Sequence, residues 1–466
     1  MNEEDHIHSI GLWRHASSAP SIGGILRSRT EDFRVDEISK HPSLDPRGRF
    51  TLIRATLKNW ETHRFITKLA QAVGISKQRI WFAGTKDKRA VTSQLFTVDA
   101  PVRVVELVGL NDVDIEVIGR THQKMSLGGH QANRFSIVVR GCCDEHGVPI
   151  DSDEAKNRVE EAKKVLSDLC GPNAVPNWVG PQRFGAGRPV THAVGRALVE
   201  DDPMGAINIY VGAEGPHESE EVAAFRAKWR DGCDANDALS DIPKHLNYER
   251  MLLERLAQKP EDPWSAIHRL PNSLRTMMIH AVQSGIFNHW LAHRLERGWS
   301  LVEPMVGDVV CALDKDGRAD RSRAIIAAEH RLDWLAHQCR SGRATITGPL
   351  PGTDSTAAEG EPGELEKAVI HNLGLGDLDW SMPHRPSLSP RGGRRAATMV
   401  ADGLEVTPSP SLSDMSLGER WTDGPSEGER WSREGGCLRF RFELPPGGYA
   451  TSALREFMQV PTRQYG

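Results

Sequence analysis

The sequence predicts an α+β fold with two or more domains. Several short segments, among them 50–57 and 437–443, alternate apolar and polar residues, which is typical of strands in a sheet. Other segments, such as 62–73, carry apolar residues at the three- and four-residue spacing of one helix face. The chain has 466 residues, more than a single hydrophobic core usually organises.

The predicted elements follow one another through most of the chain. Strands are expected within 21–38, at 50–57, within 102–118, after Asn133 and at 437–443, and helices are expected at 62–73, 153–169 and 273–296. Gly74 and Gly171 end the first two helices, as glycine commonly does. The last strand is expected to return to the sheet that the N-terminal half begins, because a sheet strand needs a pairing partner.

Two segments are expected to lack regular structure. Residues 352–364 are small and acidic, which is typical of a mobile loop. Residues 385–397 place four arginines among proline, serine and glycine. That composition indicates a flexible basic segment that could contact RNA.

The composition is that of a globular protein, with 38% hydrophobic and 26% charged residues. No apolar run approaches the roughly 20 residues that a membrane span needs, and the acidic N-terminus lacks a signal segment. We therefore expect a cytoplasmic protein without membrane association. The seven cysteines form no C-x-x-C pair, so neither a disulfide framework nor a metal site is expected.

The net charge of −5 is unevenly distributed along the chain. Residues 1–110 carry 17 Lys and Arg against 12 Asp and Glu, whereas residues 200–262 carry 7 against 15. Contact with phosphate requires a local excess of positive charge, and not a basic total. A site for nucleic acid is therefore expected in the N-terminal part.

One loop in that part places a carboxylate among cations. Asp87 is flanked by Lys86, Lys88 and Arg89, and nearby positive charges favour its ionised form. Gly84 allows a tight turn, so Asp87 is expected on a loop that leads into a strand. An ionised carboxylate in a basic loop can act as a nucleophile beside a polyanion. The alternative is an ordinary solvated turn with charges of both signs.

Residues 84–94 resemble the signature G-x-K-D-x-x-A-V-T-x-Q of the TruD family of RNA pseudouridine synthases. Four more segments resemble family motifs in the family's order: E-D-F-x-V-x-E at 31–37, G-N-x-F-x-I at 132–137 with Ala132 in place of glycine, V-P-N-[YF]-[FV]-G-x-Q-R-F-G at 175–185 and L-P-x-G-x-Y-A-T-x-x-L-R-E at 444–456. The segment 188–195 looks like the archaeal and eukaryotic branch. The resemblance covers most of the chain and is looser over 186–395.

The resemblance implies a fold and a division into domains. The fold is a pseudouridine-synthase-type catalytic domain, a mixed or antiparallel sheet with helices, split by an α+β insertion (TRUD) domain. The catalytic domain would take residues 1–185 and 396–466, and the insertion would take residues 186–395.

The resemblance also implies the activity, an isomerase that converts uridine to pseudouridine in tRNA, at position 13 as in well-known members. Asp87 would attack the flipped nucleotide at the sugar carbon or the base, so that uracil detaches, turns and rejoins through carbon. The reaction needs no cofactor and no metal, and the sequence offers no P-loop and no dinucleotide-binding G-x-G-x-x-G unit. The implied partner is tRNA, with other RNAs as further candidates. No obligate protein partner is expected.

Two residues are assigned to catalysis by the resemblance, Asp87 and Arg27. Arg27 aligns with a position where some members have a lysine that pairs with the catalytic aspartate. A guanidinium keeps the charge and can hold a carboxylate with two hydrogen bonds. Arg29 is only two residues away, and the sequence leaves open which of the two arginines pairs with Asp87.

Further residues are assigned to substrate binding. They are Phe33, Lys86, Asn133, Phe135, Gln182 and Arg183. The two phenylalanines would sandwich the flipped base, the asparagine amide would fix it, and the last two would contact the RNA backbone or orient the site. The alternatives are core packing for the phenylalanines, a turn for the asparagine and loop packing for Gln182 and Arg183.

Two other functional classes remain open at this point. A catalytically silent RNA-binding or chaperone protein could use the same fold, and its RNA binding would not depend on Asp87. A different tRNA enzyme, such as a hydrolase or a methyltransferase, would need metal ligands or a nucleotide-binding glycine loop, and the sequence shows neither.

Overall fold

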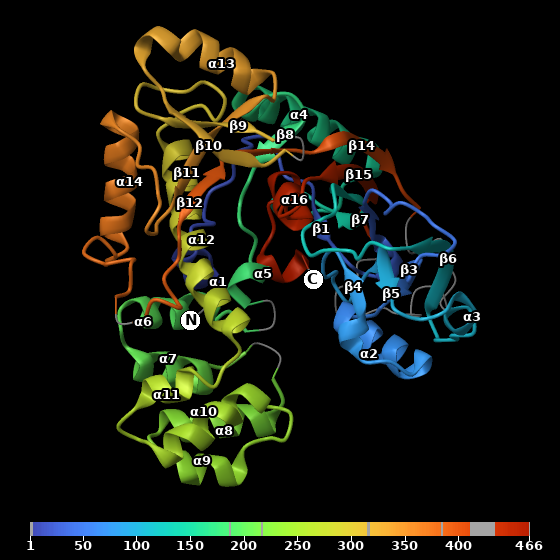
Figure 1. The fold of residues 1–466 in the computed structure, drawn as a ribbon. Coiled ribbons are helices and arrows are strands. Elements are labelled where there is room, and N and C mark those ends of the chain that lie inside the picture. The colour runs from blue at the N-terminus through green and yellow to red at the C-terminus, as the bar shows by residue number, and fades with distance from the viewer. Residues whose placement is uncertain are drawn as a thin grey trace. The chain divides into compact units, whose positions relative to one another are not determined.

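The structure is a computed structural model that describes residues 3–185, 188–215, 218–314, 317–383, 385–410 and 434–465. The chain forms two compact units (Figure 1). Unit 1 contains residues 1–14, 178–312 and 319–397, and unit 2 contains residues 15–177, 313–318 and 398–466. Within the described ranges, every helix is too short or too polar to cross a membrane.

Unit 2 is built on a mixed sheet with the strand order β14-β15-β7-β2-β5-β3-β6, to which β1 adds beside β7 and β4 beside β5. The strands are β1 (Gly23–Ile25), β2 (Phe33–Ile38), β3 (Phe50–Lys58), β4 (Ile80–Phe82), β5 (Val91–Val98), β6 (Val113–Thr121), β7 (Ala132–Cys142), β14 (Asp402–Pro408) and β15 (Leu438–Leu444). β2 and β5 are parallel, and the other pairings described in this sheet are antiparallel. A smaller pair joins β8 (Ala174–Pro176) and β13 (Thr398–Val400).

The C-terminal strand returns to the sheet that the N-terminal half begins, as the sequence predicted. β15 pairs with β7 over its whole length, and Phe442 stands opposite Phe135. The α+β fold with a mixed sheet is therefore confirmed.

Unit 2 has four α-helices among the described residues, and two of them begin and end at local sequence signals. The four helices are α2 (Thr62–Val73), α3 (Val102–Val105), α4 (Ser152–Cys170) and α16 (Ala450–Met458). The Glu61 carboxylate accepts from the first backbone N–H groups of α2, and Gly74 ends that helix with φ 74°. Asp151 caps α4 in the same way, and Gly171 ends it.

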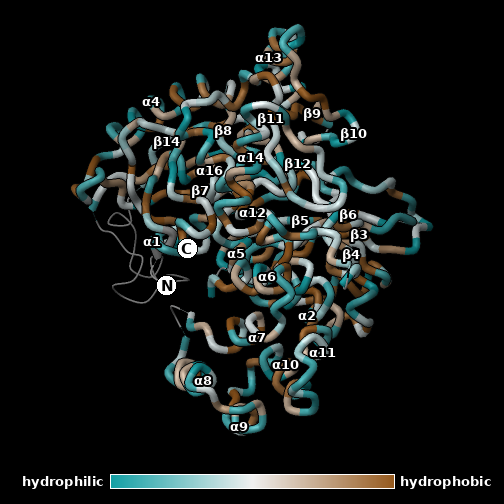
Figure 2. The backbone as a smooth tube through the Cα atoms, turned by 90° about the vertical axis from the view of Figure 1, so that its left-hand side faces the viewer, coloured by the Kyte–Doolittle hydropathy of each residue, from teal (hydrophilic) through white to brown (hydrophobic). Residues whose placement is uncertain are grey.

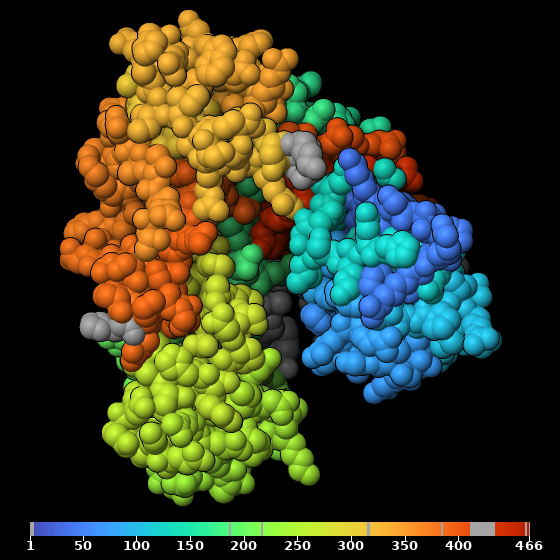
Figure 3. Space-filling model, in the orientation of Figure 1, coloured from blue at the N-terminus to red at the C-terminus, as the bar shows by residue number. Residues whose placement is uncertain are grey.

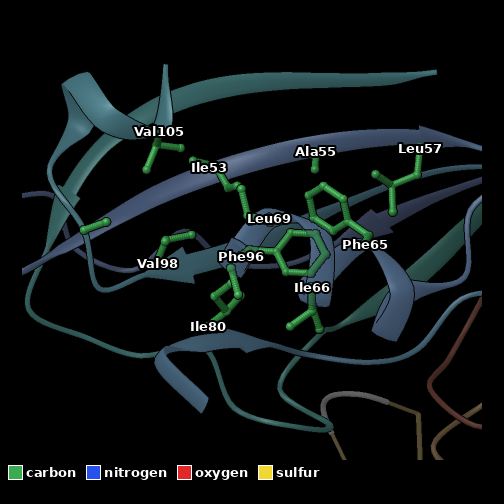
Figure 4. Close-up of a cluster of buried hydrophobic side chains, with 12 residues drawn as sticks. Ile53, Ala55, Leu57, Phe65, Ile66, Leu69, Ile80, Phe96, Val98 and Val105 are labelled. Atoms are coloured by element: carbon green, nitrogen blue, oxygen red, sulfur yellow. The ribbon is translucent and has the colours of Figure 1, made fainter. Parts of the chain in front are cut away.

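The core of unit 2 lies between α2 and the sheet (Figure 4). Phe65 and Leu69 of α2 pack against Phe96 and Val98 of β5, and all four side chains are fully buried. This face of α2 is the one that the helical spacing of apolar residues predicted. The burial holds β5, which follows the Asp87 loop, in a fixed position.

One predicted strand is wrong. Residues 102–105 form the short helix α3, and only 113–121 form a strand. The Val-Arg-Val-Val pattern also fits a helical turn, in which Val102 and Val105 share a face. Val105 is fully buried in the core beneath α2, and Pro101 stands at the N-cap with φ −65°. Proline fixes φ near the helical value, which favours a helical turn after it.

Unit 1 combines helices with a four-stranded sheet of order β10-β9-β11-β12. The strands are β9 (Val309–Leu313), β10 (Ala319–Ile326), β11 (Ala344–Leu350) and β12 (Gly393–Ala396). The helices are α1 (Glu3–Ser9), α5 (Gln182–Gly185), α6 (Thr191–Val199), α7 (Pro203–Gly212), α8 (Glu220–Arg230), α9 (Ala235–Asp241), α10 (Asn247–Gln258), α11 (Pro263–Ile267), α12 (Asn272–Glu296), α13 (Leu332–Arg340) and α14 (Gly360–Asn372).

The long helix α12 is the centre of unit 1. It packs closely on α6, because a Cβ at Gly195 would lie 2.0 Å from the Met278 carbonyl oxygen. The acidic segment 200–262 forms the helices α7 to α10, which alternate hydrophobic and hydrophilic residues along the tube in Figure 2. In Figure 3 these helices, green to yellow-green, pack into one continuous body.

Two further expectations need correction. Residues 360–364 are the first turn of α14 and not part of a loop. The segment 385–397 is not free to contact RNA throughout, because Arg394 lies in β12 with its side chain 2% exposed and paired with Glu366 at 2.7 Å. Pairing of β12 with β11 turns this arginine inward, a result of long-range contacts that local composition does not show.

The contact-based units differ from the expected domain boundaries at two places. Residues 1–14 and 178–185 lie in unit 1 with the insertion. α5 contacts α12, and the His289 ring of α12 lies against the Ser9 carbonyl oxygen of α1. The Asn288 side chain, for example, donates to the carbonyl oxygens of Ile10 and Val179 at 3.0 Å. Which unit carries which function stays a prediction.

We expect Phe96→Ala to destabilise the protein by about 3–5 kcal/mol, because it removes a large side chain from the closed core in Figure 4. Leu107→Ala is the control: Leu107 is 86% exposed, so its loss should change stability by less than about 0.5 kcal/mol. Urea unfolding followed by circular dichroism compares the two. Equal effects of the two substitutions would contradict this description of the core.

Candidate active site

The Asp87 loop joins β4 to β5, and two side chains hold the part of it that precedes Asp87. The Gln94 side chain of β5 donates to the Gly84 carbonyl oxygen at 3.2 Å. The Lys86 backbone N–H donates to the Thr62 hydroxyl oxygen at 2.9 Å, which ties the loop to the start of α2. The loop is therefore anchored before Asp87 by contacts that the strand and the helix supply.

Arg27 is the arginine that pairs with Asp87. Its Nη2 lies 2.5 Å from Asp87 Oδ2, and the two side chains are 6% and 41% exposed. Arg29 instead faces Glu31, at 3.5 Å. A buried cation thus holds a carboxylate that solvent and substrate can reach.

Local backbone geometry presents Arg27 to the loop. Arg27 follows β1 and has φ 56°, a left-handed conformation that non-glycine residues adopt at a cost of about 1 kcal/mol or more. The Arg89 Nε donates to the Arg27 carbonyl oxygen at 3.0 Å. Two contacts therefore join Arg27 to the loop: the ion pair with Asp87 and the hydrogen bond from the Arg89 side chain to the Arg27 carbonyl oxygen.

Phe33 lies against the Arg27 guanidinium, whose carbon is 4.1 Å from the ring centroid. The Phe33 and Phe135 centroids are 6.3 Å apart at 79°, and Phe135 stacks on Phe442 at 5.4 Å. These rings come from the neighbouring strands β2, β7 and β15 and are at most 7% exposed. Phe33 and Phe135 touch edge to face, so a base would enter between them only if the two rings separated.

Lys86 forms a buried ion pair with Glu37. Lys86 Nζ lies 2.8 Å from Glu37 Oε2, and the side chains are 7% and 0% exposed. Breaking a buried pair by removing one partner usually costs about 3–5 kcal/mol. Lys86 therefore fixes the loop to β2 in this structure, whatever it contributes to substrate binding.

Asn133 stands at the start of β7 beside His130. The Asn133 Nδ2 lies 3.3 Å from His130 Nε2. Asn133 Oδ1 is buried and has no hydrogen-bond partner among the described residues. Burial lowers the pKa of His130, Lys86 and Arg318 lower it further, and Glu37 opposes them. The neutral ring can accept the amide N–H, which leaves the Asn133 carbonyl oxygen to face a ligand.

Gln182 and Arg183 lie in α5, which belongs to unit 1. They are therefore in a different unit from Asp87, Arg27, Phe33, Lys86, Asn133 and Phe135. Arg183 acts locally on His280, whose pKa is lowered first by burial and then by this arginine. Their contact with RNA stays a prediction.

Several residues of the site were not predicted from the sequence. Glu37, His130 and Phe442 each contact a predicted residue. Glu37 stands in the E-D-F-x-V-x-E segment, so its place in a motif was the available signal. The contacts of His130 and Phe442 follow from strand register and turn geometry, which the sequence does not display.

A pair of histidines on α12 was also not predicted from the sequence. His289 and His293 are four residues apart, and both pack edge-on against Trp13. Such spacing can serve a metal, but no group of three His, Cys, Asp or Glu side chains with that geometry occurs among the residues described. The two histidines therefore pack α12 against the segment that follows α1.

Comparison with known proteins gives a consistent result over the whole chain. The sequence matches the model of the family tRNA pseudouridine synthase D (TruD) over residues 9–457. A protein named probable tRNA pseudouridine synthase D from Methanococcoides burtonii is 35% identical over 462 residues, which cover 99% of each chain. One of the same name from Thermococcus onnurineus is 33% identical over 98% of this chain and 99% of its own. The crystal structure of the putative tRNA pseudouridine synthase D from Methanosarcina mazei matches with a TM-score of 0.80 and 30% identity, covering 99% of both chains.

We expect His130 to titrate below its ordinary value of 6.5, because the folded protein disfavours its charged form. The unfolded chain then binds the proton first, so stability falls as the pH drops below about 6.5. Lys86→Met should raise the pKa of His130, because it removes a cation and leaves Glu37 unpaired. NMR titration of the histidine ring signals measures both values. A wild-type pKa of 6.5 or higher would contradict the geometry.

Proposed function

The chain belongs to the tRNA pseudouridine synthase D family, and we propose that it isomerises uridine to pseudouridine in tRNA with Asp87 as the nucleophile. One observation carries the proposal. A carboxylate with 41% of its side chain exposed is held at 2.5 Å by an arginine with 6% exposure, in the loop whose sequence resembles the family signature.

The proposed reaction exchanges one bond for another within the same nucleotide. The Asp87 carboxylate attacks the sugar carbon C1′ or the uracil ring, and the bond between C1′ and N1 breaks. The base turns, C5 bonds to C1′ and the bond that Asp87 had formed breaks, which frees the carboxylate. C5 then releases its proton, and N1 carries one. Electrons balance without an oxidant or a reductant, so the chemistry asks for a nucleophile and for a base that has left its stack.

Arg27 acts on the nucleophile as a positioning residue. A guanidinium forms a charge-assisted hydrogen bond to one carboxylate oxygen and so fixes the direction of the group. Because Arg27 rests on Phe33 at 4.1 Å and is almost fully buried, it has little freedom to release the carboxylate.

Asn133, Phe33 and Phe135 are proposed to receive the flipped base. The buried, unpartnered Asn133 Oδ1 can accept the N3–H of uracil, a donor that cytosine lacks at this position. Phe33 and Phe135 can provide stacking surfaces if base entry separates the rings. The two rings would therefore stack on either side of the base only when RNA is bound. Without RNA they contact each other edge to face.

We propose uridine 13 of tRNA as the target, in keeping with the family resemblance. Unit 2 would carry the chemistry, because Asp87, Arg27 and the base-binding residues all lie in it. Gln182 and Arg183 of unit 1 would contact the RNA backbone. The cytoplasm, where tRNA is abundant, is the proposed location.

Asp87→Asn should abolish pseudouridine formation, because an amide is isosteric with the carboxylate but is not nucleophilic. The assay is release of tritium from tRNA transcripts labelled at uracil C5, with chelator and without added cofactor, followed by mapping of the modified position. Asp114→Asn, an exposed aspartate on the edge strand β6, is the matched control and should keep full activity. Tight RNA binding without any release by the wild type would favour the silent RNA-binding protein.

Arg27→Ala should lower kcat about 10- to 100-fold, the effect of losing one hydrogen bond to a charged group. Arg27→Lys keeps the charge and should lose less. KM for tRNA should change little, because Arg27 lies beneath the carboxylate and not on the surface. Steady-state kinetics of both variants, with thermal melting to verify folding, separates the two constants. A rise in KM at constant kcat would contradict a positioning role.

A further inference from the structure

Arg275, in unit 1, is partly buried, and two of its three guanidinium nitrogens lack a hydrogen-bond partner. It lies in the first turn of α12, after α11. Its Nε and Nη1 atoms are both buried and lack a hydrogen-bond partner, and it is the only side chain among the described residues with two such atoms. Burying a charged donor without a partner costs several kcal/mol, so this arrangement needs an explanation beyond folding.

Three fully buried arginines of the same unit have carboxylate partners. Arg226 pairs with Glu218 at 2.8 Å, Arg294 with Asp308 at 2.7 Å and Arg394 with Glu366 at 2.7 Å. Each of these three side chains is at most 2% exposed. The unit thus supplies a carboxylate where an arginine serves the fold, and no such pair is described for Arg275.

The surroundings of Arg275 are cationic. The pKa of His268, at the end of α11, is lowered first by partial burial, then by Arg275 and Arg385, while Asp262 opposes them. Arg385 lies over the Trp264 ring at 4.5 Å, and that ring is 6.1 Å from His268. Two guanidinium groups therefore act on one imidazole, and stacking on the tryptophan fixes one of them.

We propose that Arg275, Arg385 and His268 bind a phosphate group of the tRNA backbone. The proposal rests on the proposed function, since it takes tRNA as the ligand. Guanidinium groups match phosphate oxygens with paired hydrogen bonds, and phosphate contacts fix the register of a bound nucleic acid. A phosphate would satisfy the two buried N–H groups and relieve the repulsion between the cations.

Inorganic phosphate serves as the first probe, independently of any activity. At constant ionic strength, replacing chloride by phosphate should raise the melting temperature of the wild type, because the folded state alone binds it. It should also raise the pKa of His268, since an added anion favours the charged ring. Arg275→Met should show neither effect. Without phosphate this variant should melt no lower than the wild type, because it loses two buried polar atoms that have no partner.

Binding of tRNA is the second measurement. Arg275→Met should weaken binding about tenfold or more, the effect of lost hydrogen bonds to a charged group, and should reduce the slope of log K against log salt by about 1. Arg343→Ala, an exposed arginine of the same unit just before β11, is the control and should leave the affinity within about twofold.

The outcomes separate this site from the proposed chemistry. A lower melting temperature for Arg275→Met without phosphate would show a structural role and overturn the proposal. A response to phosphate with unchanged tRNA affinity would assign the site to a small phosphate ligand and overturn the RNA assignment. If the wild type binds tRNA but forms no pseudouridine, the proposed function fails while both measurements still decide this site.

Discussion

The ion pair between Arg27 and Asp87 is the interaction on which the proposed site depends. An exposed carboxylate on a loop would have many orientations, but a buried guanidinium at 2.5 Å leaves it few. The arginine can take this place because its backbone has φ 56° and its carbonyl oxygen accepts from Arg89. The ring of Phe33 supports it from β2. Arg27, which lies two residues after the end of β1, thereby couples the Asp87 loop to the centre of the sheet.

A second buried pair makes the same loop depend on charge. The Lys86 and Glu37 side chains are only 7% and 0% exposed, so the loss of either leaves a nearly buried charge without a partner. The adjacent residues Lys86 and Asp87 differ in exposure. The Lys86 side chain is 7% exposed and holds the loop to β2, whereas the Asp87 side chain is 41% exposed. Ion pairs with two buried partners, Arg27 and Glu37, hold this run of mixed charges, which distinguishes it from a solvated turn.

Local signals in the sequence predicted much of the fold. The caps and apolar faces of α2 and α4, and the alternation in β15, are short-range features that survive folding unchanged. The sequence could not choose between Arg27 and Arg29, because the choice depends on a left-handed backbone and on burial against Phe33. Two predictions from the sequence were also wrong: the strand at 102–105 and the free basic segment around Arg394. At both places contacts between residues distant in sequence override the local pattern.

Net charge gave little guidance to function, whereas the partners of individual cations are informative. An arginine with a carboxylate partner at close range contributes to the fold, as Arg226, Arg294 and Arg394 do. Arg27 has a carboxylate partner that solvent can reach, which suits a group that takes part in chemistry. Arg275 has buried donors and no described partner, which suits a group whose partner arrives from outside. Burying a donor group without a partner costs free energy, and a bound ligand that accepts a hydrogen bond from the group would offset that cost. The same comparison of burial and pairing therefore distinguishes arginines that serve the fold from those for which a functional role is proposed.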